Sequence, residues 1–280
     1  MKLTVLVDNN TLIDHYLTAE PALSFLIETG GRKILFDTGY SDAFIQNAQK
    51  MDISLLDLDY VVVSHGHLDH TWGLVHLVKH FTEAIIEKRQ VRVPELVAHP
   101  WCFYPKPKPP LGNSGSLLSE AEAGLHFPLR LSRTPLWLTD NIVFLGEIEQ
   151  TFDFEHIDPG KRKIAMPDGR TEPDQLRDDS ALVCRTPGGL VIVTGCSHAG
   201  ICNIVEHARQ VCGDDRVRDI IGGLHLLEPG AERMEKTCRY LGSLEMEALH
   251  ACHCTSLSSK IVLAGYCPVQ EVGTGMKLEW

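Results

Sequence analysis

The stretch that decides the fold is SHGHLDHT at residues 64–71, which directly follows the apolar run YVVV at residues 60–63. The apolar run predicts a strand, so the histidines stand at a strand end. His65 and His67 are two positions apart in extended backbone, and their imidazoles therefore leave the chain on the same side. This arrangement favours a metal site over a chance group of polar residues.

Two further candidate ligands follow within the same stretch. Asp69 and His70 come where the chain is expected to turn into a helix that starts near Thr71. Imidazole and carboxylate groups are suitable ligands for borderline divalent cations such as zinc. Gly66 allows the backbone to turn between the first two histidines. The stretch therefore predicts one or two divalent metal ions, with zinc favoured over manganese, iron or magnesium.

The charge balance restricts the partners. The chain of 280 residues has 26 Lys and Arg against 37 Asp and Glu, a formal net charge of −11. It lacks the cationic footprint that nucleic acid or an anionic membrane requires. No apolar run approaches the roughly 20 residues of a bilayer span, and residues 1–10 do not resemble a secretory signal. We expect a cytoplasmic protein with a small-molecule substrate and neither a nucleic-acid nor a membrane partner.

Short β-branched runs alternate with helical patterns along the chain. This mixture predicts an α/β fold, specifically an αββα sandwich of two mixed β-sheets flanked by helices. The clearest expected strands are 3–7, 33–36, 60–64, 142–145, 181–185, 190–194, 219–221 and 248–251. The expected helices are 42–50, 71–89, 199–211, 232–241 and 259–265.

We expect a single domain over residues 1–280, interrupted by two stretches without a regular pattern. The first is an inserted loop region at about 101–133, which opens with the proline-rich segment WCFYPKPKPP. Prolines lack an N–H, so this segment is expected to be extended and outside any strand ladder. The second is a long loop at about 153–179, rich in charge, proline and glycine.

The histidine-rich stretch resembles the H-x-H-x-D-H signature of the metallo-β-lactamase superfamily, whose fold is an αββα sandwich with a one- or two-metal site. Upstream, Phe36-Asp37-Thr38-Gly39 is similar to that superfamily's F-D-T-G element. The resemblance implies that Asp37 orients a metal ligand from behind, as ligating imidazoles commonly require.

Other segments resemble one subfamily, which includes the archaeal 7,8-dihydropterin-6-methyl-4-(β-D-ribofuranosyl)aminobenzene 5'-phosphate synthase and bacterial relatives of unassigned substrate. The matching segments are 7–11, 146–148, 178–182, 194–200, 222–226 and 253–255. Two segments depart from the subfamily pattern, at three positions. Glu149-Gln150 replaces Pro-Arg, which removes a cationic contact, and Ser256 replaces a glycine.

The remaining metal ligands follow from position. His198 comes just beyond the expected strand at 190–194, and His253 just beyond the strand at 248–251. The ends of parallel strands of one sheet lie together. The expected ligand sets are His65, His67 and His198 for one ion, and Asp69, His70 and His253 for a second.

Three positions leave alternatives open. Most superfamily members carry a bridging Asp where this chain has Cys196, whose thiolate could ligate a metal or leave the second site weaker. Asp178 and Asp179 stand where other members carry their third histidine, so Asp179 is a further candidate ligand. The sequence does not rank Cys196 against Asp179. His225 follows another strand end and is either a substrate or oxyanion contact or a structural histidine.

The resemblance implies a metal-dependent hydrolase-like enzyme. It would use a metal-bound hydroxide, or a metal-stabilised leaving group, on a small anionic substrate that contains phosphate or an ester, with a pterin-like compound as one option. Asp69 and His225 are the expected catalytic residues. A synthase-type transferase is the first alternative. A non-catalytic metal- or ligand-binding relative and a nuclease are further alternatives, and the negative net charge disfavours the nuclease.

Overall fold

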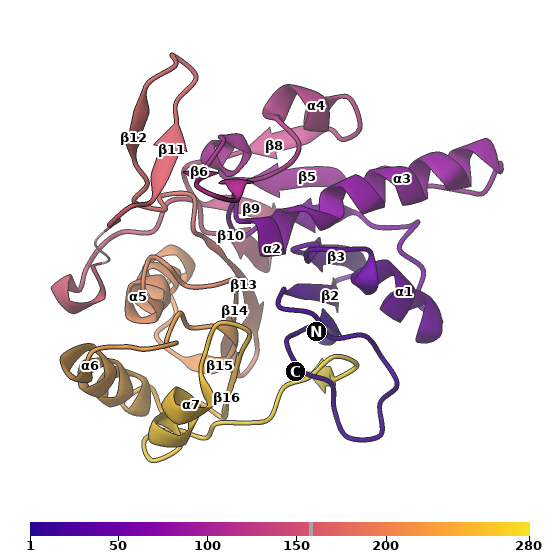
Figure 1. The fold of residues 1–280 in the computed structure, drawn as a ribbon. Coiled ribbons are helices and arrows are strands. Elements are labelled where there is room, and N and C mark those ends of the chain that lie inside the picture. The colour runs from indigo at the N-terminus through magenta and orange to yellow at the C-terminus, as the bar shows by residue number, and fades with distance from the viewer. Residues whose placement is uncertain (157–158) are drawn as a thin grey trace. The chain divides into compact units, whose positions relative to one another are not determined.

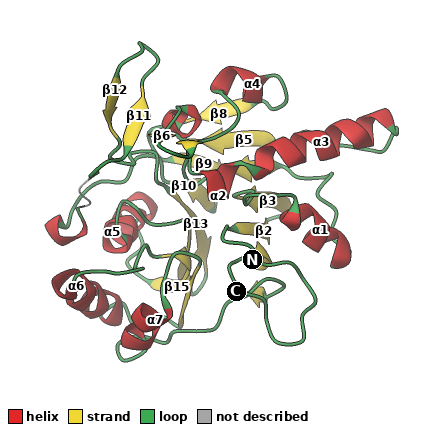
Figure 2. Cartoon of the chain, in the orientation of Figure 1, coloured by secondary structure: helices red, strands yellow, loops and turns green. Residues whose placement is uncertain are grey.

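A computed structural model describes residues 1–156 and 159–280. The chain forms two compact units (Figure 1). Unit 1 comprises Met1–Ser132, Pro159–Asp178 and Gly273–Trp280, and unit 2 comprises Arg133–Asp158 and Asp179–Val272. Each unit contains one large mixed β-sheet with helices beside it (Figure 2). The expected single domain over residues 1–280 stays a prediction.

The sheet of unit 1 has seven strands in the order β17-β1-β2-β3-β4-β5-β8. Pairing is antiparallel from β17 to β3 and parallel from β3 to β8. The strands are β1 (Lys2–Val7), β2 (Ser24–Thr29), β3 (Arg32–Phe36), β4 (Tyr60–Val62), β5 (Glu95–Ala98), β8 (Leu129–Leu131) and β17 (Lys277–Glu279).

The helices of unit 1 are amphipathic where they are long enough to judge. Helix α3 (Gly73–Ile86) buries Leu74, Leu77 and Phe81, whose spacing places them on one face. They join the same buried apolar cluster as the strand residue Val61. The other helices of this unit are α1 (Ala43–Lys50), α2 (Leu68–Thr71), α4 (Glu120–Gly124) and the 3₁₀ turn η1 (Pro100–Phe103).

The sheet of unit 2 has six strands in the order β16-β15-β14-β13-β10-β9, parallel from β14 to β16 and antiparallel elsewhere. Strand β14 is buried along its whole length, as its continuous apolar run predicts. The strands are β9 (Leu136–Thr139), β10 (Ile142–Phe144), β13 (Ala181–Thr186), β14 (Gly189–Thr194), β15 (Val217–Gly223) and β16 (Ala248–Cys252). The helices are α5 (Ile201–Cys212), α6 (Ala231–Gly242), α7 (Leu257–Leu263) and the 3₁₀ turn η2 (Asp153–Glu155).

Both stretches expected to be irregular contain short strands. In the proline-rich segment, β6 (Pro107–Lys108) pairs with β7 (Gly112–Asn113), so the expectation that it joins no ladder is wrong. Only some positions there are prolines, and the lysines between them keep their N–H groups. The 153–179 stretch differs from the expected long loop, since β11 (Lys163–Ala165) pairs with β12 (Thr171–Pro173) around a turn at Gly169. Residues 157 and 158 of that stretch lie outside the described residues.

Within the described residues, no helix combines the length and the apolar composition needed to cross a lipid bilayer.

Candidate metal centre

In unit 1 the histidine-rich stretch begins two residues after β4 and ends in α2. The Nε2 atom of His65 lies 3.0 Å from Nδ1 of His67. The rings of His65 and His70 are 4.3 Å apart between centroids. The structure therefore gathers all three imidazoles that the sequence singles out in this stretch. His65 and His70 are fully buried.

Asp37 supports two of these imidazoles from behind. It follows β3 in a left-handed conformation, with φ of 56°. Its carboxylate lies 2.7 Å from Nδ1 of His70 and accepts hydrogen bonds of 2.7 Å from both the backbone N–H and the hydroxyl of Ser64. The Ser64 hydroxyl in turn lies 2.9 Å from Nδ1 of His65. Asp37 and Ser64 thus fix Nδ1 of His70 and of His65, and Nε2 of each ring faces a further candidate ligand, Asp69 for His70 and His67 for His65.

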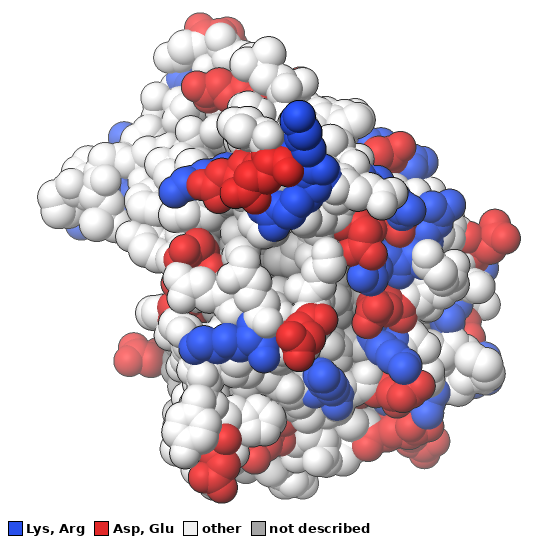
Figure 3. Space-filling view, turned by 90° about the vertical axis from the view of Figure 1, so that its right-hand side faces the viewer, with Lys and Arg blue, Asp and Glu red and all other residues white. Residues whose placement is uncertain are grey.

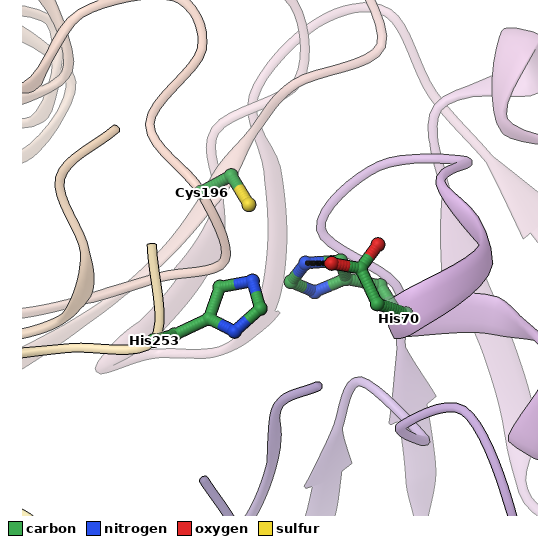
Figure 4. A group of neighbouring side chains, drawn as sticks. His70, Cys196 and His253 are labelled. Atoms are coloured by element: carbon green, nitrogen blue, oxygen red, sulfur yellow. Dashed lines mark ion pairs between the residues drawn. The ribbon is translucent and has the colours of Figure 1, made fainter. Parts of the chain in front are cut away.

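Asp69 lies at the start of α2, next to these rings. One of its carboxylate oxygens is 3.8 Å from Nε2 of His70, an ion pair drawn as the dashed line beside His70 in Figure 4. A quarter of its side-chain surface is exposed to solvent, whereas the side chain of His70 is fully buried. Of the two potential ligands Asp69 and His70, Asp69 is therefore the one that solvent reaches.

The protonation state of His67 suits metal binding. Burial, and next the ammonium group of Lys106, lower the pKa of His67 to about 3. The imidazole is consequently neutral at neutral pH, which is the form that ligates a metal.

In unit 2, four further side chains follow the ends of three neighbouring strands. Cys196 and His198 come after β14, His225 after β15 and His253 after β16. The sulfur of Cys196 lies within 4.8 Å of a ring nitrogen of His198 and of one of His253. Figure 4 shows Cys196 and His253 directed toward one another. The rings of His198 and His225 are 4.2 Å apart between centroids.

The backbone of these turns is unusual. Ser197, His225 and His253 have φ values of 57°, 50° and 50°, in the left-handed region that non-glycine residues rarely adopt. Such conformations persist only where the surrounding structure enforces them, and they cluster at functional sites. The observation marks these turns as a candidate site independently of their side chains.

Cys254, which the sequence indicates only as a packing residue, contacts two of the other turns. Its sulfur accepts a hydrogen bond of 3.3 Å from the His225 N–H and lies 3.4 Å from the carbonyl oxygen of Cys196. Burial raises the pKa of this thiol, but contacts with Cys196 and His225 outweigh it and hold the pKa well below its usual value. Cys254 therefore links the turn at 196 to the turn at 225.

The two candidates that the sequence left unranked have different surroundings. The sulfur of Cys196 lies near imidazole nitrogens, as described above, whereas one Asp179 oxygen accepts a hydrogen bond of 2.9 Å from the Ala199 N–H. Asp179 thus holds the backbone just after His198. Its neighbour Asp178 belongs to unit 1 and contacts the histidine-rich stretch there.

Comparison with a family model shows to which protein superfamily the chain belongs. The model of the metallo-beta-lactamase superfamily matches residues 17–160, slightly more than half of the chain. The chain belongs to the metallo-beta-lactamase superfamily. This match confirms the superfamily that the sequence predicts. The predicted fold, with two mixed β-sheets and flanking helices, is confirmed as well. Members of the metallo-beta-lactamase superfamily typically bind divalent metal ions.

Individual members of the superfamily are similar over most of the chain. The 7,8-dihydropterin-6-methyl-4-(beta-D-ribofuranosyl)-aminobenzene-5'-phosphate synthase of Methanocaldococcus jannaschii is 32% identical over 254 residues, which cover 86% of this chain and 83% of that protein. Tm1679, a metal-dependent hydrolase of the beta-lactamase superfamily, matches with a TM-score of 0.82 and 26% identity over 100% of this chain and 99% of that one. YhfI from Bacillus subtilis, with a TM-score of 0.58 and 12% identity over 100% and 98% of the two chains, shares the fold.

The donor groups fit a divalent metal on geometric grounds. Zinc binds imidazole nitrogens at 2.0–2.1 Å, so two nitrogens on a tetrahedral ion lie about 3.3 Å apart. The 3.0 Å between His65 Nε2 and His67 Nδ1 is close to that separation. The imidazole, thiol and carboxylate groups of both units are donors that zinc accepts.

Proposed function

We propose that this protein is a metal-dependent enzyme of hydrolase type that acts on a small anionic substrate containing a phosphate or an ester group. The observation that carries the proposal is the pair His65–His67, held by Ser64 and Asp37 at the spacing of a metal ligand pair. Membership of a superfamily that typically binds divalent metals supports it. Similarity to Tm1679, named as a metal-dependent hydrolase, supports the reaction type.

The proposed metal ligands are those the sequence indicates. One divalent ion, zinc by preference, would be held by His65, His67 and His198, and a second by Asp69, His70 and His253. Cys196 and Asp179 are the additional candidates. Cys196 is the favoured one, because its sulfur lies near imidazole nitrogen atoms. When bound, a divalent metal lowers the pKa of a coordinated water and polarises a carbonyl or phosphoryl oxygen.

Two residues are proposed to act on the substrate. Asp69 is partly accessible to solvent and can hold or move a proton at its carboxylate. Nδ1 of His225 is buried and makes no hydrogen bond within the described part of the chain. A buried polar atom of this kind requires a partner, and an oxygen of the substrate would supply one. His225 would thereby stabilise negative charge that develops on the substrate.

The nuclease alternative finds little support in the charge distribution. On the face shown in Figure 3, Lys and Arg side chains are interspersed with Asp and Glu side chains. Together with the net charge of −11, this pattern lacks the basic track along which a nucleic-acid backbone binds.

A synthase-type transferase is the second candidate, favoured by the 32% identity to the archaeal synthase. The two candidates differ in the group that attacks the substrate, which is water in a hydrolase and an aminobenzene ribose phosphate in the transferase. The test is to load the purified protein with Zn²⁺, Mn²⁺ or Fe²⁺ and assay it against a panel of esters, lactones, phosphoesters and pterin diphosphates. Water-dependent cleavage of an ester or phosphoester supports the hydrolase. Release of diphosphate only when an aminobenzene ribose phosphate is also present supports the transferase, and no turnover with any metal contradicts both.

Removing the Asp37 carboxylate tests how the ligands are held. Asp37→Ala deletes the acceptor for Ser64 and for His70 at once, so the imidazoles lose their fixed orientation. We expect the dissociation constant for Zn²⁺ to rise by about 10- to 100-fold, as for other residues that orient metal ligands. Competition with a fluorescent chelator measures this constant. The matched control is Asp57→Ala, an exposed carboxylate in an ion pair with Lys33, which should leave zinc affinity unchanged. Equal affinities for the two variants would contradict the role of Asp37.

A further inference from the structure

Unit 1 contains a buried lysine at a position where the proline-rich sequence favours a solvated one. Lys106 lies in the proline-rich segment and has only 2% of its surface exposed. Its ammonium group is 3.0 Å from an oxygen of Asp174 and 3.1 Å from an oxygen of Asp178. Both carboxylates are buried as well, with 1% and 0% exposed. A buried ion pair of this kind brings no certain gain in stability, so it calls for another explanation.

The second oxygen of Asp178 connects this group to the histidine-rich stretch. It accepts a hydrogen bond of 2.8 Å from the N–H of Gly66, the residue between His65 and His67. On its other side Gly66 packs against the backbone of Cys102, so closely that a Cβ atom on Gly66 would overlap the Cys102 carbonyl oxygen. The turn between the two histidines is therefore held by Asp178 and by the segment that leads to Lys106.

The charges explain why the lysine is needed. Burial disfavours the charged form of Lys106, but the carboxylates of Asp178 and Asp174 outweigh it and raise the pKa of the ammonium group above its usual value. Burial likewise opposes ionisation of Asp178, yet Lys106 and the Gly66 N–H hold the pKa of its carboxyl below the usual range. Without the ammonium group, two carboxylates would stay buried without a counter-charge, which is strongly destabilising.

We propose that Lys106 and Asp178 are positioning residues for the metal ligands: Lys106 neutralises Asp178, and Asp178 fixes the Gly66 N–H so that His65 and His67 converge. The assignment rests on the proposed metal-dependent function. Neither residue contacts the substrate in this role. The proline-rich insert thereby takes part in building the metal site, because its lysine is the counter-charge of the carboxylate that holds the turn.

Asp174 provides a matched control for Asp178. Each carboxylate makes one ion pair with Lys106 and one hydrogen bond with a backbone N–H, but Asp174 bonds to Leu176 and Asp178 to Gly66. Asp174→Ala and Asp178→Ala therefore remove the same groups and differ in whether the histidine turn loses its support. Two readouts are needed: the Zn²⁺ dissociation constant, and hydrogen exchange at the Gly66 amide in the metal-free protein.

For Asp178→Ala we expect the Zn²⁺ dissociation constant to rise at least tenfold and Gly66 exchange to accelerate at least tenfold. For Asp174→Ala both should stay within threefold of the unmodified protein. Lys106→Met should weaken zinc binding at least tenfold. Equal effects of the two aspartate variants, or zinc binding by Lys106→Met within threefold of the unmodified protein, would overturn the proposal.

Two further outcomes also decide the proposal: a variant that does not fold, and an unmodified protein that binds no metal. If Asp178→Ala does not fold, Asp178→Asn replaces it with the same thresholds. Asp178 accepts from Lys106 with one oxygen and from Gly66 with the other, and asparagine has an NH₂ group, which cannot accept, in place of one of them. If the unmodified protein binds no metal, the proposed function fails, and Gly66 exchange alone decides whether Asp178 holds the turn. Unchanged exchange in Asp178→Ala would then reject the positioning role as well.

Discussion

Replacing His65 and His67 together by alanine is expected to remove bound metal and turnover at the same time. The two nitrogen atoms that lie 3.0 Å apart are both lost, and the remaining ligands cannot restore the pair. We expect zinc affinity to fall by more than about 100-fold, beyond the loss caused by changing a residue that only orients a ligand. The measurements are metal content after dialysis against zinc buffer, and activity on the best substrate from the panel.

The control for this double variant is His126→Ala, which removes an exposed histidine of unit 1. It should retain metal and activity. Because His65 is buried and His67 is partly buried, thermal unfolding of the metal-free proteins must be compared to show that the double variant is folded. Full turnover by a folded, metal-free double variant would end the proposal of a metal-dependent enzyme.

Gly73→Ala is expected to cause the largest loss of stability among single glycine variants of unit 1. Gly73 begins α3, and a Cβ atom there would overlap the carbonyl oxygen of Thr38. Thr38 is itself fixed by hydrogen bonds to the carbonyl oxygen of His70, so neither backbone can move alone. We expect the free energy of unfolding to fall by about 3 kcal/mol, the upper part of the range for overpacked sites. Denaturant titration measures the change.

Gly124→Ala is the matched control in the same unit. It lies in α4, and the nearest neighbour of a Cβ atom would be the Leu129 side chain at an ordinary 3.5 Å. Alanine favours a helix over glycine by up to about 1 kcal/mol, so this variant should be neutral or slightly stabilised. A Gly73→Ala protein as stable as Gly124→Ala would show that α3 does not depend on the close approach to Thr38.

The sequence predicts those elements whose apolar runs are long or followed by a distinctive motif. Strands β13 and β14 and helix α5 appear where expected, because continuous apolar runs and helical periodicity distinguish them. Strands β2 and β5 were missed. The β5 segment Glu95–Ala98 is short and contains one β-branched residue, so only its parallel pairing with β4 and β8 makes it a strand.

The contacts of Lys106 could not be predicted for a different reason. A lysine between prolines usually lies in solvent, and the exposed Lys108 follows that rule. Lys106 is instead paired with a carboxylate 72 positions later. Such pairs arise from the tertiary structure and leave no local pattern. The same holds for Cys254, whose neighbours Cys196 and His225 belong to other strand ends.

The left-handed turns at His225 and His253 determine how mutational scans of this protein should be interpreted. Glycine and asparagine adopt that backbone at little cost, whereas valine, isoleucine and threonine do not. A β-branched replacement would reshape the loop as well as delete the imidazole, so its phenotype would mix two causes. Asparagine at either position keeps the chain path, and it isolates what the ring contributes.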